Sequence, residues 1–96
     1  MFICTEEQAV QLERKVIEIL ENKREDLNVS RAEWGRRAFG MDTANTQSKI
    51  QSIVGKLRSD GTAKRITIGD LLKLSQALEV DAAHVLSAAL LESKIL

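Results

Sequence analysis

The chain has 96 residues, a formal net charge of zero, 44% apolar and 29% charged residues. This length allows one domain with one hydrophobic core, residues 1–96, and leaves no room for a separate catalytic domain. The composition is that of a globular chain, and no apolar run approaches the roughly eighteen residues that a membrane span needs. The absence of proline and the scarcity of aromatic residues favour helices over sheets.

The N-terminal sequence and the cysteine content indicate the compartment. No basic stretch followed by an apolar run stands at the start, so we expect no signal peptide. The single cysteine, Cys4, cannot form an internal disulfide. We therefore expect a cytoplasmic protein that does not enter a membrane.

The first predicted helix begins after Thr5, which forms a capping box with Gln8. Apolar residues then recur at spacings of three and four, which predicts an amphipathic helix of about five turns. These residues are Ala9, Leu12, Val16, Ile19 and Leu20. The following segment, ENKREDLN, contains neither proline nor glycine, so the sequence does not define the residue at which this helix ends.

A second, shorter helix is predicted from Ser30 to Gly40. Ser30 and Glu33 have the spacing of a capping box, and Val29 and Trp34 that of a hydrophobic staple. Gly40 stands where a helix ends, because glycine tolerates the left-handed geometry of that position. We expect Trp34, and Phe39 beside the glycine, to belong to the core.

A polar turn, MDTAN, leads to a third helix over residues 46–57, the predicted recognition helix. Its apolar residues follow helical spacing and define a buried stripe: Ile50, Ile53, Val54 and Leu57. The other face carries small amide and hydroxyl side chains, with one lysine near its edge. Such side chains pair with base edges in the DNA major groove. The predicted base contacts are Gln47, Ser48, Lys49, Gln51 and Ser52.

Two more helices complete the chain. Ile66, Thr67 and Asp70 indicate the start of a fourth helix, which should bury Leu71, Leu74 and Leu78. Val80 and Asp81 introduce a fifth helix, whose predicted inner residues are Val85, Leu86, Ala89 and Leu90.

The zero net charge hides an uneven distribution. Residues 1–29 hold four basic and seven acidic side chains, residues 30–68 eight and three, and residues 69–96 two and four. A basic centre between acidic ends is typical of a localised anionic partner, although chance clustering on a solvated face explains it equally well.

The segments SRAEWGRRAFG, TQSKIQSIVGKL and ITIGDLLKLSQALEVDAAHVL together resemble the lambda-repressor-like, Cro/Xre-type DNA-binding family, over about residues 7–86. The resemblance implies an all-α domain of five helices whose second and third form a helix-turn-helix. Gly35 stands where the family has a small residue between these two helices. The interval from Gly35 to Gly40 and the MDTAN turn are longer than usual, as in phage-type members, and Arg31 replaces a common glutamine.

The implied function is transcription regulation by sequence-specific binding to double-stranded DNA. The recognition helix would enter the major groove, and a dimer would place two such helices about 34 Å apart on a palindromic operator. Basic side chains around it are the candidate phosphate contacts, each with a solvated surface role as its alternative. They are Arg31, Arg36, Arg37, Lys56, Arg58, Lys64 and Arg65.

The last ten residues, 87–96, are more apolar than a terminal helix requires. We expect them to form a homodimer interface, with a fold back onto the first helix or a frayed end as alternatives. The interface residues would be Leu90, Leu91, Ile95 and Leu96.

A second function remains open, that of an antitoxin or another helical module whose main partner is a protein. An enzyme is not expected, because the chain has one histidine, no glycine-rich phosphate loop and no nucleophile–base set. His84 has no second ligand at suitable spacing, so we expect neither a metal site nor a cofactor.

Overall fold

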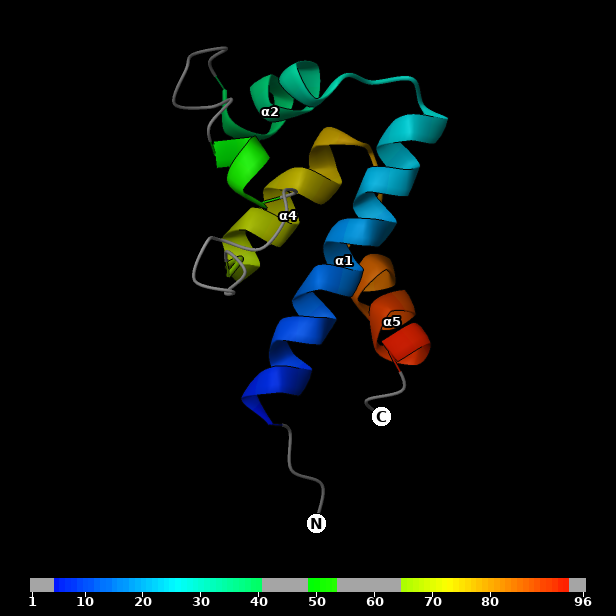
Figure 1. The fold of residues 1–96 in the computed structure, drawn as a ribbon. Coiled ribbons are helices and arrows are strands. Elements are labelled where there is room, and N and C mark those ends of the chain that lie inside the picture. The colour runs from blue at the N-terminus through cyan, green and yellow to red at the C-terminus, as the bar shows by residue number, and fades with distance from the viewer. Residues whose placement is uncertain (1–4, 41–48, 54–64, 94–96) are drawn as a thin grey trace.

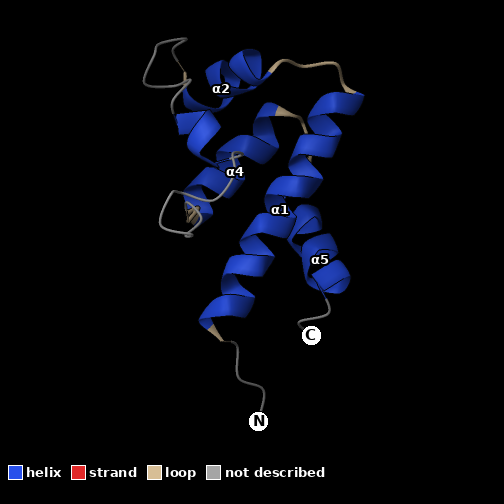
Figure 2. Cartoon of the chain, in the orientation of Figure 1, coloured by secondary structure: helices blue, strands red, loops and turns tan. Residues whose placement is uncertain are grey.

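The computed structural model describes residues 5–40, 49–53 and 65–93. These ranges contain α1 (Glu6–Asp26), α2 (Arg31–Phe39), a helical segment at residues 49–53, α4 (Ile68–Ala77) and α5 (Ala82–Ser93). Throughout the described ranges, all regular secondary structure is helical (Figure 2). The prediction of an all-α chain with five helical segments is therefore confirmed.

The helices pack in two pairs, and α4 connects one pair to the other. α1 lies along α5, α2 crosses α4, and α4 also contacts α1 and α5 (Figure 1). One apolar core joins all of them and includes the segment 49–53. Its buried residues are Val16, Ile17, Leu20, Val29, Trp34, Ile50, Ile53, Leu74, Ala77, Leu78, Val85 and Ala89.

Three helices begin at the predicted caps. Thr5 and Thr67 each form a complete capping box with the residue three positions later. Ser30 accepts a hydrogen bond from the backbone N–H of Glu33 at 3.1 Å, which confirms half of the box predicted there. The carboxylate of Glu33 does not complete it but turns along α2 to Arg36 and Arg37, since two guanidinium groups are stronger donors than one amide.

Two helices end in Schellman motifs without glycine. After α1, the N–H of Asn28 donates to Glu25 and that of Val29 to Arg24, and Asn28 has a φ of 58°. After α4, the same pattern places Glu79 at a φ of 57°. α2 ends at Gly40 with a φ of 99°, as predicted. Because asparagine and glutamate occupy the left-handed position, neither motif was recognisable from the sequence.

The predicted core needs two corrections. Leu86 was expected on the inner face of α5, but it is 37% exposed, because it lies at the edge of the contact with α1, where it lines a hollow with Leu12 and Val16. The buried residues of α5 are Val85 and Ala89. Ile17 was not predicted to be buried, yet only 2% of it is exposed. α1 packs against both α4 and α5, so its buried face is wider than one stripe.

Candidate nucleic-acid interface

The described part of the predicted recognition helix, residues 49–53, separates apolar from polar side chains as predicted. Ile50 and Ile53 are 1% and 0% exposed. Lys49, Gln51 and Ser52 are exposed. The other two predicted base contacts, Gln47 and Ser48, and the apolar Val54 and Leu57 lie outside the described residues.

Polar contacts hold this segment from three sides. Nη1 of Arg14, on α1, donates to the carbonyl oxygen of Ile53 at 2.8 Å. Nζ of Lys49 lies 3.5 Å from Oδ1 of Asp70, on α4, and 4.6 Å from the ring centroid of Phe39, at the end of α2. The backbone that carries Gln51 and Ser52 is therefore positioned by α1, α2 and α4 together.

Lys49 itself is engaged with the protein. Its side chain is 43% exposed, while that of its partner Asp70 is only 11% exposed and also caps α4 through the N–H of Thr67. A guanine contact by Lys49 would have to compete with this carboxylate and with the cation–π contact to Phe39. Gln51 and Ser52 thus remain the more accessible of the described candidates.

Trp34 and Phe39 pack into the structure, as expected. Trp34 is 0% exposed, and its indole Nε1–H donates to the carbonyl oxygen of Leu74 at 3.0 Å. Phe39 is half-buried against the core. The hydrogen bond from Trp34 links α2 to α4 and helps to fix the position of α2 relative to α4.

Every described candidate phosphate contact is paired with a carboxylate. Arg31 lies 3.1 Å from Glu21, and Arg65 lies 2.6 Å from Glu13 and also pairs with Glu6. Arg36 and Arg37 share Glu33. The remaining candidates, Lys56, Arg58 and Lys64, lie outside the described residues. Much of the positive charge counted along the basic centre is therefore offset within the fold.

Three of these carboxylates have lowered pKa values. Hydrogen bonds from Arg36 and Arg37 lower the pKa of Glu33 from 4.5 to about 2. Burial raises the pKa of Glu13, but the donors of Arg65 and the N–H of Ile66 outweigh it and lower the pKa overall. For Glu21, burial is likewise outweighed by Arg24 and Arg31, so its pKa falls.

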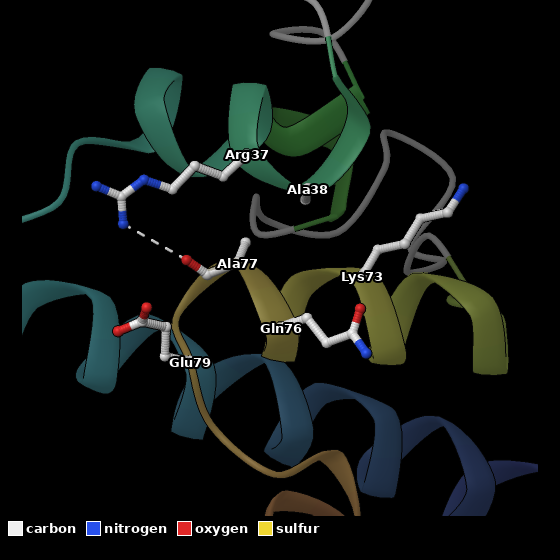
Figure 3. Close-up of a pocket in the computed structure, with 6 residues that line it drawn as sticks. All are labelled: Arg37, Ala38, Lys73, Gln76, Ala77 and Glu79. Atoms are coloured by element: carbon white, nitrogen blue, oxygen red, sulfur yellow. Dashed lines mark hydrogen bonds between the residues drawn. The ribbon is translucent and has the colours of Figure 1, made fainter.

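A polar hollow of about 540 Å³ lies between α2 and α4 (Figure 3). Its lining residues are Arg37, Ala38, Lys73, Gln76, Ala77 and Glu79. Nζ of Lys73 lies 6.0 Å from the ring centroid of Phe39, on which Lys49 also sits. Sequence reasoning missed Lys73 because it belongs to the acidic C-terminal third, although its spacing from Asp70 places both on the same side of α4.

The C-terminal prediction is only partly within the described residues. Leu91 is 75% exposed and Leu90 is half-buried, while Ile95 and Leu96 lie outside the described ranges. Three other exposed apolar side chains belong to α4 and α5, namely Ile68 at 85%, Leu72 at 47% and Leu86 at 37%, and Leu27 at the end of α1 is 45% exposed. Ile68 and Leu86 line one apolar hollow of about 160 Å³ with residues of α1.

Within the described ranges, no three His, Cys, Asp or Glu side chains are grouped so that they could hold a metal ion. None of the helices there combines the length and the apolar character needed to cross a membrane. Comparisons with protein-family models, curated proteins and solved structures returned no match for this chain.

Proposed function

We propose that the protein is a sequence-specific regulator that binds double-stranded DNA through a lambda-repressor-like helix-turn-helix, formed by α2 and the recognition helix at residues 46–57. The observation that supports this most strongly is the arrangement of side chains and contacts in the segment 49–53. Gln51 and Ser52 point to solvent from a backbone that Arg14 and Lys49 tie to the rest of the fold. Side chains that read bases need such a rigid support.

In this proposal the recognition helix lies in the major groove. Gln47 and Gln51 would pair with adenine, Ser48 and Ser52 would contact either base, and Lys49 would donate to guanine. The arginines of α2 and Arg65 would contact phosphates and set the orientation on the duplex. These contacts require exchange of a carboxylate partner for a phosphate, which all four described arginines permit because their side chains are 43–50% exposed.

The proposal includes a homodimer on a palindromic operator, as in a phage-type repressor. Leu91 supports this, because a leucine that is 75% exposed at the end of α5 offers apolar area for burial. A two-fold dimer doubles the length of DNA that is read. Light scattering of the intact chain and of a chain truncated after Ala89 tests it, and a monomer at tens of micromolar for the intact chain would contradict it.

Selection of bound sites from random duplex DNA, followed by binding measurements at increasing salt, tests the DNA proposal. We expect a defined motif and an affinity that falls steeply with salt as condensed counterions are released. Absence of binding at low salt, or binding that salt does not change, would overturn the proposal.

Two matched substitutions separate base reading from phosphate positioning. Gln51→Ala should cost about 1–3 kcal/mol on the preferred base pair alone and flatten the preference there. Arg31→Ala should weaken all sequences alike and reduce the salt dependence. If Gln51→Ala leaves the preference unchanged, the recognition helix docks in another register.

The second candidate function is that of an antitoxin-like module whose main partner is a protein. This candidate is favoured by three exposed apolar side chains that lie on α4 and α5, outside the segment 49–53: Ile68, Leu72 and Leu86. This function would be favoured over the first by two results together. The protein would bind a protein partner strongly unless Ile68→Ser is introduced, and its binding to DNA would show no sequence preference.

A further inference from the structure

Glu33 differs from three of the other carboxylates that hold the basic residues. Those three also support the fold: Glu13 accepts the N–H of Ile66, Glu21 also binds Arg24, and Asp70 caps α4. Glu6 is a second partner of Arg65, beside Glu13. Among the described residues, by contrast, every hydrogen bond to the carboxylate of Glu33 comes from a guanidinium group. The start of α2 does not depend on this carboxylate, because Ser30 binds the backbone N–H of residue 33.

The two guanidinium groups converge on one oxygen. Nε of Arg37 donates to Oε1 of Glu33 at 3.0 Å, Arg36 donates to the same oxygen, and Nε of Arg36 donates to Oε2 at 2.8 Å. A phosphate oxygen accepts hydrogen bonds from arginine in the same way as a carboxylate oxygen. The three side chains are 33–50% exposed, so a phosphate can approach from solvent.

We propose that Glu33 occupies, in the free protein, the position that a DNA phosphate takes between Arg36 and Arg37, and so limits the affinity for DNA. This inference rests on the proposed DNA-binding function and concerns how that site is regulated by the chain itself. Binding requires the carboxylate to leave the two arginines, so the free energy of these ion pairs is subtracted from the free energy of association.

Glu33→Gln tests the proposal because it removes the negative charge and keeps the size of the side chain. We expect the affinity for duplex DNA at about 50 mM salt to rise roughly three- to tenfold, since two exposed ion pairs no longer have to be broken. We also expect the slope of log affinity against log salt to steepen by about one, because one more protein charge is neutralised by phosphate on binding.

Glu18→Gln is the matched control. It changes the net charge by the same amount, but Glu18 lies on α1 and pairs with Lys15 at 3.4 Å. We expect less than a twofold change in affinity. If Glu18→Gln raises the affinity as much as Glu33→Gln does, the effect is one of overall charge and the proposal is wrong.

A second comparison locates the effect at the arginines. In an Arg36→Ala/Arg37→Ala background, Glu33→Gln should no longer increase the affinity. If the gain in affinity persists in that background, the proposal is wrong. It is also wrong if Glu33→Gln alone leaves the affinity unchanged or weakens it. In either case, salt-sensitive binding by the unaltered protein would still support the proposed DNA function. If neither the unaltered protein nor Glu33→Gln binds any duplex, both proposals fail.

Discussion

The α1–α5 side and the α2 side of the molecule are held together in different ways. α1 and α5 meet mainly through buried apolar residues such as Val16, Leu20 and Val85. α2 and the segment 49–53 share the same core but are also located by directional contacts, from Trp34 to Leu74 and from Arg14 to Ile53. Apolar burial supplies free energy without fixing direction, whereas a hydrogen bond fixes position. Substitutions on the first side should therefore change stability, and those on the second should change placement and binding.

The largest expected effect is that of Leu20→Ala on the α1–α5 side. Leu20 is 0% exposed, so the substitution leaves a cavity and should lower the free energy of unfolding by about 2–5 kcal/mol in denaturant titrations. Ile68→Ala is the control, because Ile68 is 85% exposed and its loss should stay within about 0.5 kcal/mol. Similar losses in both variants would contradict the assignment of the core.

Arg14→Met should separate placement from stability. It keeps the aliphatic part of the side chain but removes the donor to the carbonyl oxygen of Ile53, at a cost of about 1–3 kcal/mol. The free energy of sequence-specific DNA binding should fall by more than the free energy of unfolding, because the backbone that carries Gln51 and Ser52 can then shift. Lys15→Met, whose lysine pairs with the exposed Glu18, should leave both nearly unchanged. Unaltered DNA preference in Arg14→Met would show that this tie does not position the segment.

Glu79→Gly should stabilise the end of α4. Glu79 holds a φ of 57°, a conformation that costs a residue with a side chain about 1–2 kcal/mol and glycine nothing. After the entropy that glycine loses on folding, a gain of about 0.5–1 kcal/mol should remain, visible as a rise in the thermal midpoint. Asn28→Gly is the control at the end of α1, and its gain should be smaller because asparagine tolerates this conformation. A loss of stability in Glu79→Gly would mean that its side chain contributes more than the backbone costs.

The smallest expected effect is the acid dependence of the α2 ion pairs. Because the pKa of Glu33 falls from 4.5 in the unfolded chain to about 2 in the folded one, its stabilising contribution is complete above pH 4.5 and is lost as the pH falls toward 2. The lowered pKa values of Glu13 and Glu21 act in the same direction. Urea titrations between pH 2 and 5 should show a flatter decline for Glu33→Gln than for the unaltered protein. An equal decline in both would show that Glu33 is not coupled to its arginines.

Local signals in the sequence predicted local structure well. Thr5, Ser30 and Thr67 were predicted as helix caps and Gly40 as a helix end, because each acts through its own side chain or backbone within one turn. The ends at Asn28 and Glu79 were not predictable in this way, since a left-handed residue without glycine is selected by the packing of the next segment. Val29, which follows Asn28, belongs to the core, and Val80, which follows Glu79, packs against it.

By itself, the sequence determined most of the residues that turn inward, including Ile50 and Ile53 opposite Gln51 and Ser52, because helical spacing sorts side chains by face. Only the tertiary structure decided which groups meet. Arg65 pairs with Glu13 across 52 residues, and Arg14 reaches Ile53 across 39. A charge count along the chain adds up the basic residues of a region. It carries no information about which distant carboxylates the fold brings to them, and that pairing determines how much positive charge the surface presents to an anionic partner.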